Sequence, residues 1–324
     1  MEFNYLLTSC MNIQKQPQQP VWGVIQNISQ PDFALLAGDT VYLKKQDWVL
    51  LTGKIAANRI LARNIEQRNE WYFQHFLANT PSYSTWDDHD YGKNDADKQQ
   101  AGKEESLKAF QSVWANPSFG TSKTRGVFYT FSWGDVQFLV MDSRYYRDKA
   151  TESQFGTAQM EWLFAELLVS KATFKIIVSA FDVIARGWSQ DCKDIGAFVS
   201  QHNISGVLFN AGDIHRNEFK VRNVENWPYP VHQITSSGIA VATCRRPFAL
   251  IHVNTLLSDP ELTVSFYGAQ TKSLNYDTID AALPVSTWSN DPNVSCRDVE
   301  KGNRGQEASC TQSIRLSDVS ILAE

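Results

Sequence analysis

Short apolar runs and segments of helical periodicity alternate from the start of the chain. Residues 3–8 and 33–37 have the continuous apolar character of buried strands, and apolar residues recur at helical spacing over 18–28 between them. This order predicts a strand–helix–strand unit with parallel strands. Ligands of such sheets bind just beyond the carboxyl ends of the strands, where Cys10 and Asp39 fall. We therefore expect these two side chains to share one edge of a sheet.

The same periodicities continue along the rest of the chain. The turn Trp133-Gly134-Asp135 joins two alternating segments, 127–131 and 136–141, which predicts an antiparallel hairpin. Residues 274–311 are polar and irregular. Further helices are predicted at 56–79, 102–114, 157–170 and 195–202, and further strands at 83–86, 174–179, 207–209, 231–235, 248–253 and 262–267.

Neither an internal repeat nor a Gly/Ser linker interrupts this succession of elements. We therefore predict one domain over 1–324, with 274–311 as an irregular C-terminal loop region. The chain is 324 residues long and 43% hydrophobic, which is enough to bury a full core.

Charge and hydropathy limit the partners of the protein. A formal net charge of −5 provides no broad cationic surface, so duplex nucleic acid and anionic lipid are not expected partners, whereas a local cationic pocket for one phosphate is compatible with it. No run of about 18 apolar residues is present, so no membrane span is predicted. The sequence predicts no particular oligomeric state.

The first residues lack the charged start and long apolar stretch of a secretory signal. Because a strand pattern begins almost at the first residue, we expect a mature or trimmed start from which an export signal is missing. This expectation favours a periplasmic or extracellular location, with a cytoplasmic location as the alternative.

Five cysteines are present: Cys10, Cys192, Cys244, Cys296 and Cys310. If Cys10 ligates a metal, the remaining four permit two disulfides in an oxidising compartment. Cys296 and Cys310 flank a polar, Gly-containing loop, and we favour that pair. Free thiols in a cytosolic protein are the alternative.

Three short acidic segments, far apart in sequence, each follow a predicted strand. They are Gly38-Asp39-Thr40-Val41-Tyr42, Trp86-Asp87-Asp88-His89-Asp90-Tyr91-Gly92 and Ala211-Gly212-Asp213-Ile214-His215. Carboxylate oxygens suit hard cations, while imidazole, phenolate and thiolate suit iron or zinc. We interpret the three segments, with Cys10, as one site that holds more than one ion. Taken singly, a Gly-Asp turn or an isolated Cys10 would be structural.

The second segment is the most informative one. Asp87, Asp88, His89 and Asp90 crowd three carboxylates and an imidazole into four positions, which is unfavourable unless cations or solvent relieve the repulsion. We expect Asp88 to be a ligand, His89 to be a proton donor or oxyanion stabiliser, and Asp90 to fix the His89 tautomer. Asn94 is a candidate for a supporting contact. A solvated acidic surface loop is the alternative.

Asp213 and His215 are separated by one residue, so in an extended conformation they would face the same side and share a metal pair. Arg216 follows them and adds a candidate phosphate contact.

Taken in order, four motifs resemble the PhoD-like branch of the calcineurin-like metallophosphatases, the alkaline phosphatase/phosphodiesterase D family. They are Ser9-Cys10, Gly38-Asp39 with Tyr42, Asp87-Asp88-His89, and Gly212-Asp213-Ile214-His215. Met141-Asp142-Ser143-Arg144-Tyr145-Tyr146-Arg147 and Thr235-Ser236-Ser237-Gly238 extend the similarity, which covers about residues 3–253. A histidine that is common in the superfamily is replaced at 178–181 by Val-Ser-Ala-Phe, which leaves the number of metals open.

The resemblance implies a four-layer α/β/β/α sandwich with two mixed sheets flanked by helices. It implies a phosphatase or phosphodiesterase that uses Fe3+ and Ca2+, with Zn2+ or Mn2+ as alternatives. By position in the motifs, the iron ligands would be Cys10, Asp39, Tyr42 and His215, and the calcium ligands would be Asp39, Asp88 and Asp213.

The expected reaction is attack on phosphorus by a metal-bound hydroxide, with a small phosphate ester as substrate. His89 would assist the leaving oxygen, Asp87 would support the site, and Arg144, Arg147 or Arg216 would hold a nonbridging oxygen. A phosphotriesterase or nuclease using the same site is one alternative. A noncatalytic calcium-binding module is another, although such a module needs only oxygen ligands and would not require Cys10.

Overall fold

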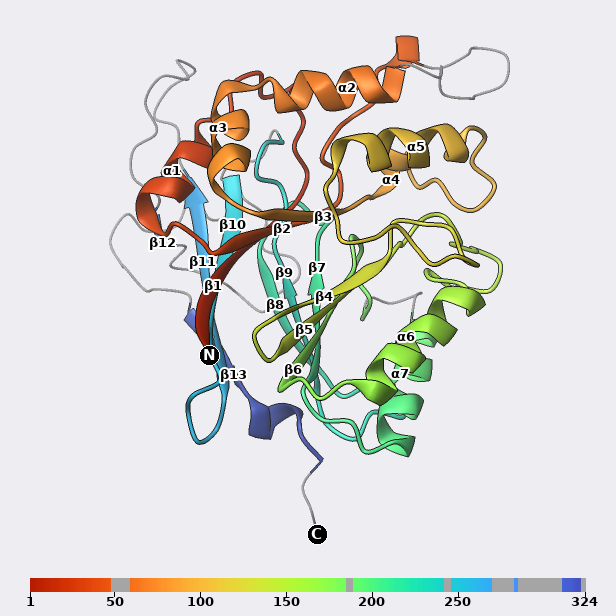
Figure 1. Ribbon diagram of the computed structural model, residues 1–324, viewed down its shortest axis with the longest axis vertical. Helices are drawn as coiled ribbons and strands as arrows, with labels where there is room; N and C mark the ends of the chain where they lie inside the picture. Colours follow the sequence, from red (N-terminus) through yellow and green to blue (C-terminus); the bar gives the residue numbers. More distant parts are fainter. Residues whose placement is uncertain (48–58, 185–188, 242–245, 270–282, 285–310, 322–324) are drawn as a thin grey trace, which may run out of the picture.

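The computed structural model describes residues 1–47, 59–184, 189–241, 246–269, 283–284 and 311–321. Within these residues, two mixed β-sheets lie at the centre of the molecule and helices flank them (Figure 1). This arrangement confirms the predicted fold class.

The first sheet combines a parallel part with an antiparallel part. Strands β1, β2 and β3 are parallel neighbours, whereas β10 runs antiparallel to β1, and β11 pairs antiparallel with β10, β12 and β13. The bounds are β1 (Glu2–Thr8), β2 (Phe33–Ala37), β3 (Ser82–Thr85), β10 (Arg246–Asn254), β11 (Glu261–Ala269), β12 (Leu283–Pro284) and β13 (Thr311–Arg315).

The second sheet is built in the same mixed way. Its order is β4-β5-β6-β7-β9-β8, in which β5, β6, β7 and β9 are parallel and the two edge strands are antiparallel to their neighbours. The bounds are β4 (Tyr129–Trp133), β5 (Val136–Val140), β6 (Phe174–Val178), β7 (Val207–Ala211), β8 (Glu218–Arg222) and β9 (Val231–Thr235).

Helices α1 to α5 lie together at one end of the molecule, beside the first sheet, and α6 and α7 lie beside the second (Figure 1). They are α1 (Val21–Ile28), α2 (Arg59–Arg68), α3 (Trp71–Asn79), α4 (Asp88–Tyr91), α5 (Lys103–Val113), α6 (Thr157–Val169) and α7 (Ser189–Gln201). Two 3-10 turns, Lys45–Asp47 and Leu316–Val319, complete the described elements.

The alternation of side chains along β1 explains how the first sheet is buried on both faces. Tyr5 and Leu7 point into the core between the sheets, and Leu6 points to the opposite face, where it joins Trp22 of α1. Between the sheets, the rings of Tyr5 and Phe138 pack edge to face with their centroids 5.3 Å apart. A strand that is buried on both faces has a continuous apolar sequence, which is why these strands could be predicted from the sequence.

Most predicted elements are present within a few residues of their expected limits. The helix expected over 56–79 is divided, because the Glu70 side chain accepts a hydrogen bond from the backbone N–H of Phe73 (2.7 Å) and so starts α3 as a separate helix. Strand β8 was not predicted, because its sequence, Glu218–Arg222, is half-exposed at a sheet edge and rich in charge. The acidic segment expected to be a loop instead forms α4, a single helical turn that begins after Asp87.

Two further expectations concern the C-terminal region and the cysteines. The region predicted to be irregular contains β12 and ends in the first residue of β13, while its remainder lies outside the described residues, as do Cys244, Cys296 and Cys310. Cys192 is a buried free thiol, so it takes no part in a disulfide. No described helix is long and apolar enough to span a bilayer.

Candidate metal centre

The candidate ligands come from the carboxyl ends of parallel strands in both sheets. Cys10 follows β1, Asp39 follows β2, Asp88 follows β3, and Asp213 and His215 follow β7. Because the strands are parallel within each sheet, these ends lie on one side of the molecule, as expected for ligand sites in α/β sheets.

The first ligand group consists of Cys10, Asp39 and His215. Their ligand atoms all lie within 4.8 Å of one another. The Tyr42 hydroxyl joins this group, because it donates a hydrogen bond to Asp39 Oδ2 (2.8 Å), and Cys10 Sγ lies 3.6 Å from the same oxygen. The set therefore offers thiol, phenol, imidazole and carboxylate donors to one point.

The second ligand group consists of Asp39, Asp88 and His89, again within 4.8 Å of one another. Asp39 belongs to both groups, so its carboxylate stands where it can bridge two cations. The Tyr42 ring stacks on the His89 ring with centroids 4.3 Å apart, which fixes the plane of the imidazole. Asp88 Oδ2 accepts a hydrogen bond from the backbone N–H of Asp95 (2.6 Å), which orients that carboxylate.

The acids of this site lie too close together to be ionised without compensation. Burial, and then the charges of Asp87, Asp88 and Asp90, raise the pKa of Asp39 well above its ordinary value. Burial also raises the pKa of Asp90 and of Asp213, each to about 6. Bound cations would remove this penalty, because they stabilise the ionised carboxylates.

The remaining donors also suit metal binding. Burial, and then the neighbouring Asp39, raise the pKa of the Cys10 thiol and of the Tyr42 phenol, so both are protonated until a cation displaces the proton. Burial lowers the pKa of His89 and His215, which keeps both imidazoles in the neutral form that ligates metals. The residues present therefore fit a pair of cations that share Asp39.

Asp88 differs from its neighbours. Burial opposes its ionisation, but the charge of Arg144 and the backbone hydrogen bonds outweigh burial and lower the pKa of Asp88. Asp88 is thus the carboxylate of the group that is ionised most readily.

Asp90 has a role other than the one predicted. Its Oδ1 accepts hydrogen bonds from the Thr40 backbone N–H (2.8 Å), the Thr40 hydroxyl (2.6 Å) and the Val41 N–H (3.1 Å), and its Oδ2 accepts from the Asp87 N–H (2.9 Å). Among the contacts of the described residues, none joins Asp90 to the His89 ring. Asp90 instead ties the loop after β2 to the start of α4.

The three candidate phosphate-binding arginines have different surroundings. Arg144 is fully buried, with its Nε 2.5 Å from Asp87 Oδ1 and its Nη2 3.9 Å from Asp88 Oδ1, so its charge serves the acidic cluster. Arg147 is buried, and its guanidinium lies over the Phe181 ring at 5.2 Å. Arg216 is exposed and pairs with Glu218 (3.3 Å).

The loop after β7 is a tight turn and not the extended segment that was predicted. Asp213 and His215 both have left-handed backbones (φ 69° and 54°), and the Ile214 N–H donates to the Gly212 carbonyl (3.0 Å). As a result the His215 ring joins Cys10 and Asp39, whereas the Asp213 carboxylate belongs to neither ligand group and its backbone oxygen lies 3.9 Å from Cys10 Sγ.

Two supporting residues were missed as site residues in the sequence. The Ser237 hydroxyl donates to Cys10 Sγ (3.2 Å) and accepts from the His215 backbone N–H (3.0 Å), so it holds two ligands at once. Lys15 is exposed, and its charge adds to burial in lowering the pKa of both His89 and His215. Ser237 lies in one of the recognised motifs, which was a usable signal, whereas an isolated lysine carries none.

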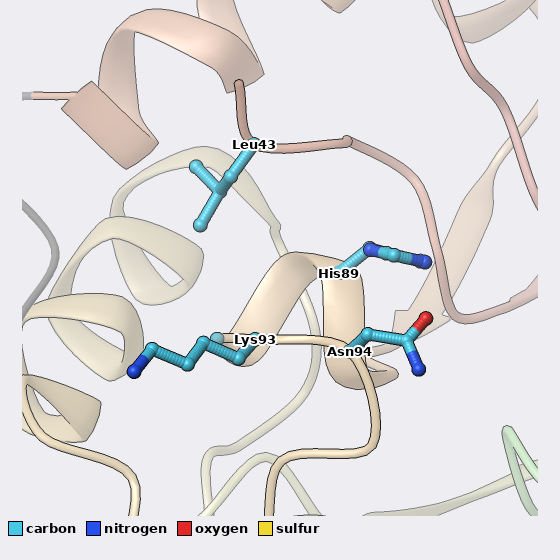
Figure 2. A pocket seen from close by; sticks show the side chains of 5 residues that line it. Leu43, His89, Lys93 and Asn94 are labelled. Atoms are coloured by element: carbon cyan, nitrogen blue, oxygen red, sulfur yellow. The ribbon is translucent and has the colours of Figure 1, made fainter. Parts of the chain in front are cut away.

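A small pocket opens beside His89. Its volume is about 240 Å³, and it is lined by Leu43, His89, Gly92, Lys93 and Asn94 (Figure 2). Asn94, predicted as a supporting residue, thus lies on a pocket wall and also donates a hydrogen bond to Asp95 Oδ2 (2.8 Å).

Two facing mixed sheets, with metal-binding side chains at the carboxyl ends of their parallel strands, define a metallophosphatase fold. The chain belongs to the PhoD-like phosphatase family, whose model matches residues 5–233, more than half of the chain. It is therefore a phosphatase or phosphodiesterase enzyme.

Solved structures share this fold. The match to the structure of PhoD covers 86% of this chain and 68% of the PhoD chain, with a TM-score of 0.70 and 14% identity. A second match is a purple acid phosphatase, PPD1 from seeds of yellow lupin (Lupinus luteus). This match covers 87% of this chain and 53% of the phosphatase chain, with a TM-score of 0.56 and 11% identity. At these identities the likeness concerns the fold. No curated protein sequence matches the chain.

Proposed function

We propose that the protein hydrolyses small phosphate monoesters or diesters with the help of two kinds of cation that share Asp39. The observation that carries this proposal is the membership of Asp39 in both ligand groups. A single carboxylate common to two sets of donors is the arrangement that a two-metal hydrolase needs.

The donor chemistry distinguishes the two positions. Cys10, Tyr42 and His215 provide thiolate, phenolate and imidazole, which favour Fe3+ or Zn2+, and we assign iron there with Asp39. Asp39 and Asp88 provide carboxylate oxygens, which favour Ca2+ or Mn2+, and we assign calcium there, with Asp213 as a further proposed ligand. When bound, such cations lower the pKa of a water and polarise the phosphoryl oxygens.

The remaining steps belong to side chains of this chain. His89 is held by the Tyr42 ring and is neutral, so its N–H is available to the oxygen of the leaving alcohol. Lys15 is exposed and its charge contributes to lowering the pKa of both candidate histidines, so we assign its ammonium to the attraction of the anionic substrate. Arg144, buried on Asp87, keeps the acids of α4 in place.

The test is a comparison of the wild-type protein with Asp88→Ala. Both would be purified, their metals quantified, and their turnover measured on a panel of phosphate mono-, di- and triesters. We expect Asp88→Ala to lose metal and turnover together while its circular dichroism remains that of the wild type, because Asp88 is the first residue of the short helix α4 and belongs to neither of the two large apolar clusters.

Asp194→Ala is the matched control, since Asp194 is an exposed carboxylate on α7 and should be dispensable. Unchanged turnover in Asp88→Ala would contradict the proposed site. Calcium without iron or zinc, and no turnover of any ester by the wild type, would indicate a binding module instead.

A further inference from the structure

We propose that Ser237 is a positioning residue for the proposed reaction, and that its hydroxyl controls how strongly the Cys10 sulfur donates electrons to a cation bound there. This inference rests on the proposed function, because it concerns the cation assigned to the first ligand group. Ser237 contacts two candidate ligands that come from different sheets, so its effect on the reaction passes through those ligands.

The Ser237 hydroxyl is held between these two ligands. It donates a hydrogen bond to Cys10 Sγ (3.2 Å), and its oxygen accepts one from the backbone N–H of His215 (3.0 Å). Cys10 follows β1 in the first sheet, His215 follows β7 in the second sheet, and Ser237 itself follows β9. One fully buried side chain therefore joins the ligand loops of both sheets.

Backbone contacts fix the loop that carries Ser237. On one side, the N–H groups of Gly238 and Ile239 both donate to the Ser9 carbonyl (3.0 and 3.2 Å). On the other side, a Cβ added to Gly238 would stand 3.1 Å from His215 Cα, and the left-handed backbone of Gly238 (φ 102°) also favours glycine. The hydroxyl is thus placed by the fold, so orienting it costs little entropy when a cation binds.

A second hydroxyl also faces the Cys10 sulfur. The Ser9 hydroxyl lies 3.5 Å from Cys10 Sγ and 3.4 Å from the Ser236 carbonyl oxygen, so its hydrogen bond to the sulfur is longer and shared. Hydrogen bonds to a ligating sulfur withdraw electron density from it, and such contacts change both the affinity and the electronic properties of the bound metal. Of the two hydroxyls, Ser237 makes the shorter contact and is the one that also holds His215.

The experiment uses Co2+ as the probe, because a charge-transfer band between sulfur and cobalt reports the first ligand group alone. Chelator-treated wild type and Ser237→Ala are each titrated with Co2+ in competition with a chelator. We expect Ser237→Ala to bind Co2+ about tenfold more weakly, because Cys10 and His215 lose their common support. The band should move to lower energy, because a sulfur without this hydrogen bond releases its electrons more easily.

Steady-state kinetics separate positioning from substrate binding. With cations at saturating concentration, we expect Ser237→Ala to lower kcat about tenfold on a chromogenic phosphodiester and to leave KM unchanged, because the hydroxyl acts through the ligands. Ser237→Thr keeps the hydroxyl, so it should restore kcat and the energy of the cobalt band toward the wild-type values.

Ser236→Ala is the matched control, because it removes a hydroxyl from the adjacent and equally buried serine. That hydroxyl donates to Asn217 Oδ1 (2.6 Å), which is not a candidate ligand, so the band and the Co2+ affinity should stay at the wild-type values. Ser9→Ala should move the band in the same direction as Ser237→Ala by a smaller amount. It provides the test if Ser237→Ala does not fold.

Two results would overturn the inference while the proposed function stands. One is an unshifted band in both Ser237→Ala and Ser9→Ala, and the other is an equal shift in Ser236→Ala, which would show a general effect of deleting a buried hydroxyl. If the wild type gave no sulfur-to-cobalt band, Cys10 would not be a ligand. The proposed assignment of the first ligand group would then fail, and this inference with it.

Discussion

The backbone at the candidate metal centre departs from ordinary conformations at single residues. Cys10, Asp39, Asp213 and His215 all have positive φ angles, between 53° and 69°, in a region that side-chain-bearing residues seldom adopt. Each such residue costs on the order of 1–2 kcal/mol. Four at one site indicate that the fold holds these side chains in positions chosen by function and not by local stability.

At the residue scale, His89 is the side chain whose role is most open to experiment. We expect His89→Ala to lower kcat by roughly 10²- to 10⁴-fold, the range for loss of a proton-transfer group, while metal content is retained because Asp39 and Asp88 remain. Steady-state kinetics and metal quantification on the same preparation would measure this. The exposed His75, changed to Ala, is the control. Equal loss of metal and turnover would identify His89 as a ligand.

At the scale of elements, the site depends on the joint between α4 and the loop after β2. Asp90 makes this joint by accepting four hydrogen bonds while almost fully buried. We expect Asp90→Ala to lower the free energy of unfolding by about 3 kcal/mol or more, because several buried donors lose their acceptor at once. Urea unfolding of the metal-free protein would measure the loss without interference from ligand binding.

Thr40→Val provides the graded comparison for Asp90, since it removes only the hydroxyl bond and leaves the backbone bonds. A loss of about 1 kcal/mol is expected there. If Asp90→Ala unfolded at the same urea concentration as the wild type, Asp90 would not be the joint between the two elements.

The buried pair of Arg144 and Asp87 connects α4 to the segment after β5. Arg144→Gln leaves the Asp87 carboxylate uncompensated at 1% exposure, and we expect the free energy of unfolding to fall by about 3–5 kcal/mol. The double variant Asp87→Asn/Arg144→Gln removes both charges and should recover part of that loss. Thermal and chemical unfolding of the three proteins would decide the matter, and a double variant no more stable than the single one would contradict the charge argument.

At the scale of the whole molecule, the buried carboxylates of the candidate metal centre make the free energy of unfolding depend on pH. The pKa of Asp213 is raised by burial from 3.8 to about 6 in the metal-free fold, so between these pH values the folded protein binds more protons than the unfolded chain. The stability from this group is therefore fully present below about pH 3.8 and is lost as pH rises through 6. The ionised carboxylate destabilises the metal-free protein at neutral pH.

Asp213→Asn tests this linkage. In chelator-treated protein, we expect the variant to exceed the wild type in free energy of unfolding by roughly 1–3 kcal/mol at pH 7.5 and by much less at pH 4.5. With cations present the order should reverse at pH 7.5, because the variant lacks a carboxylate that the cations stabilise. An equal difference at both pH values in the metal-free state would exclude titration of Asp213 as the cause.

Residue periodicity accounts for most of the fold. Strands such as β2 and β6 are buried at every position and therefore read as unbroken apolar runs, and the helices show an apolar stripe. The exceptions are elements that lack such an apolar pattern. β8 is a charged edge strand that exists because β9 pairs with it, and α4 is a helix because Asp87 and Asp90 cap its first turn.

The sequence by itself determined the order of strands and helices, the family motifs at the strand ends, and the residue types offered to a metal. Only the tertiary structure decided how those residues are used: that Arg144 neutralises Asp87, that Asp90 binds the loop at Thr40, and that Lys93 faces a pocket beside His89. The reason is physical. Periodicity reports which face of an element is buried, which is a local property, whereas the partner of a polar group depends on loops brought together by packing of segments up to hundreds of residues apart.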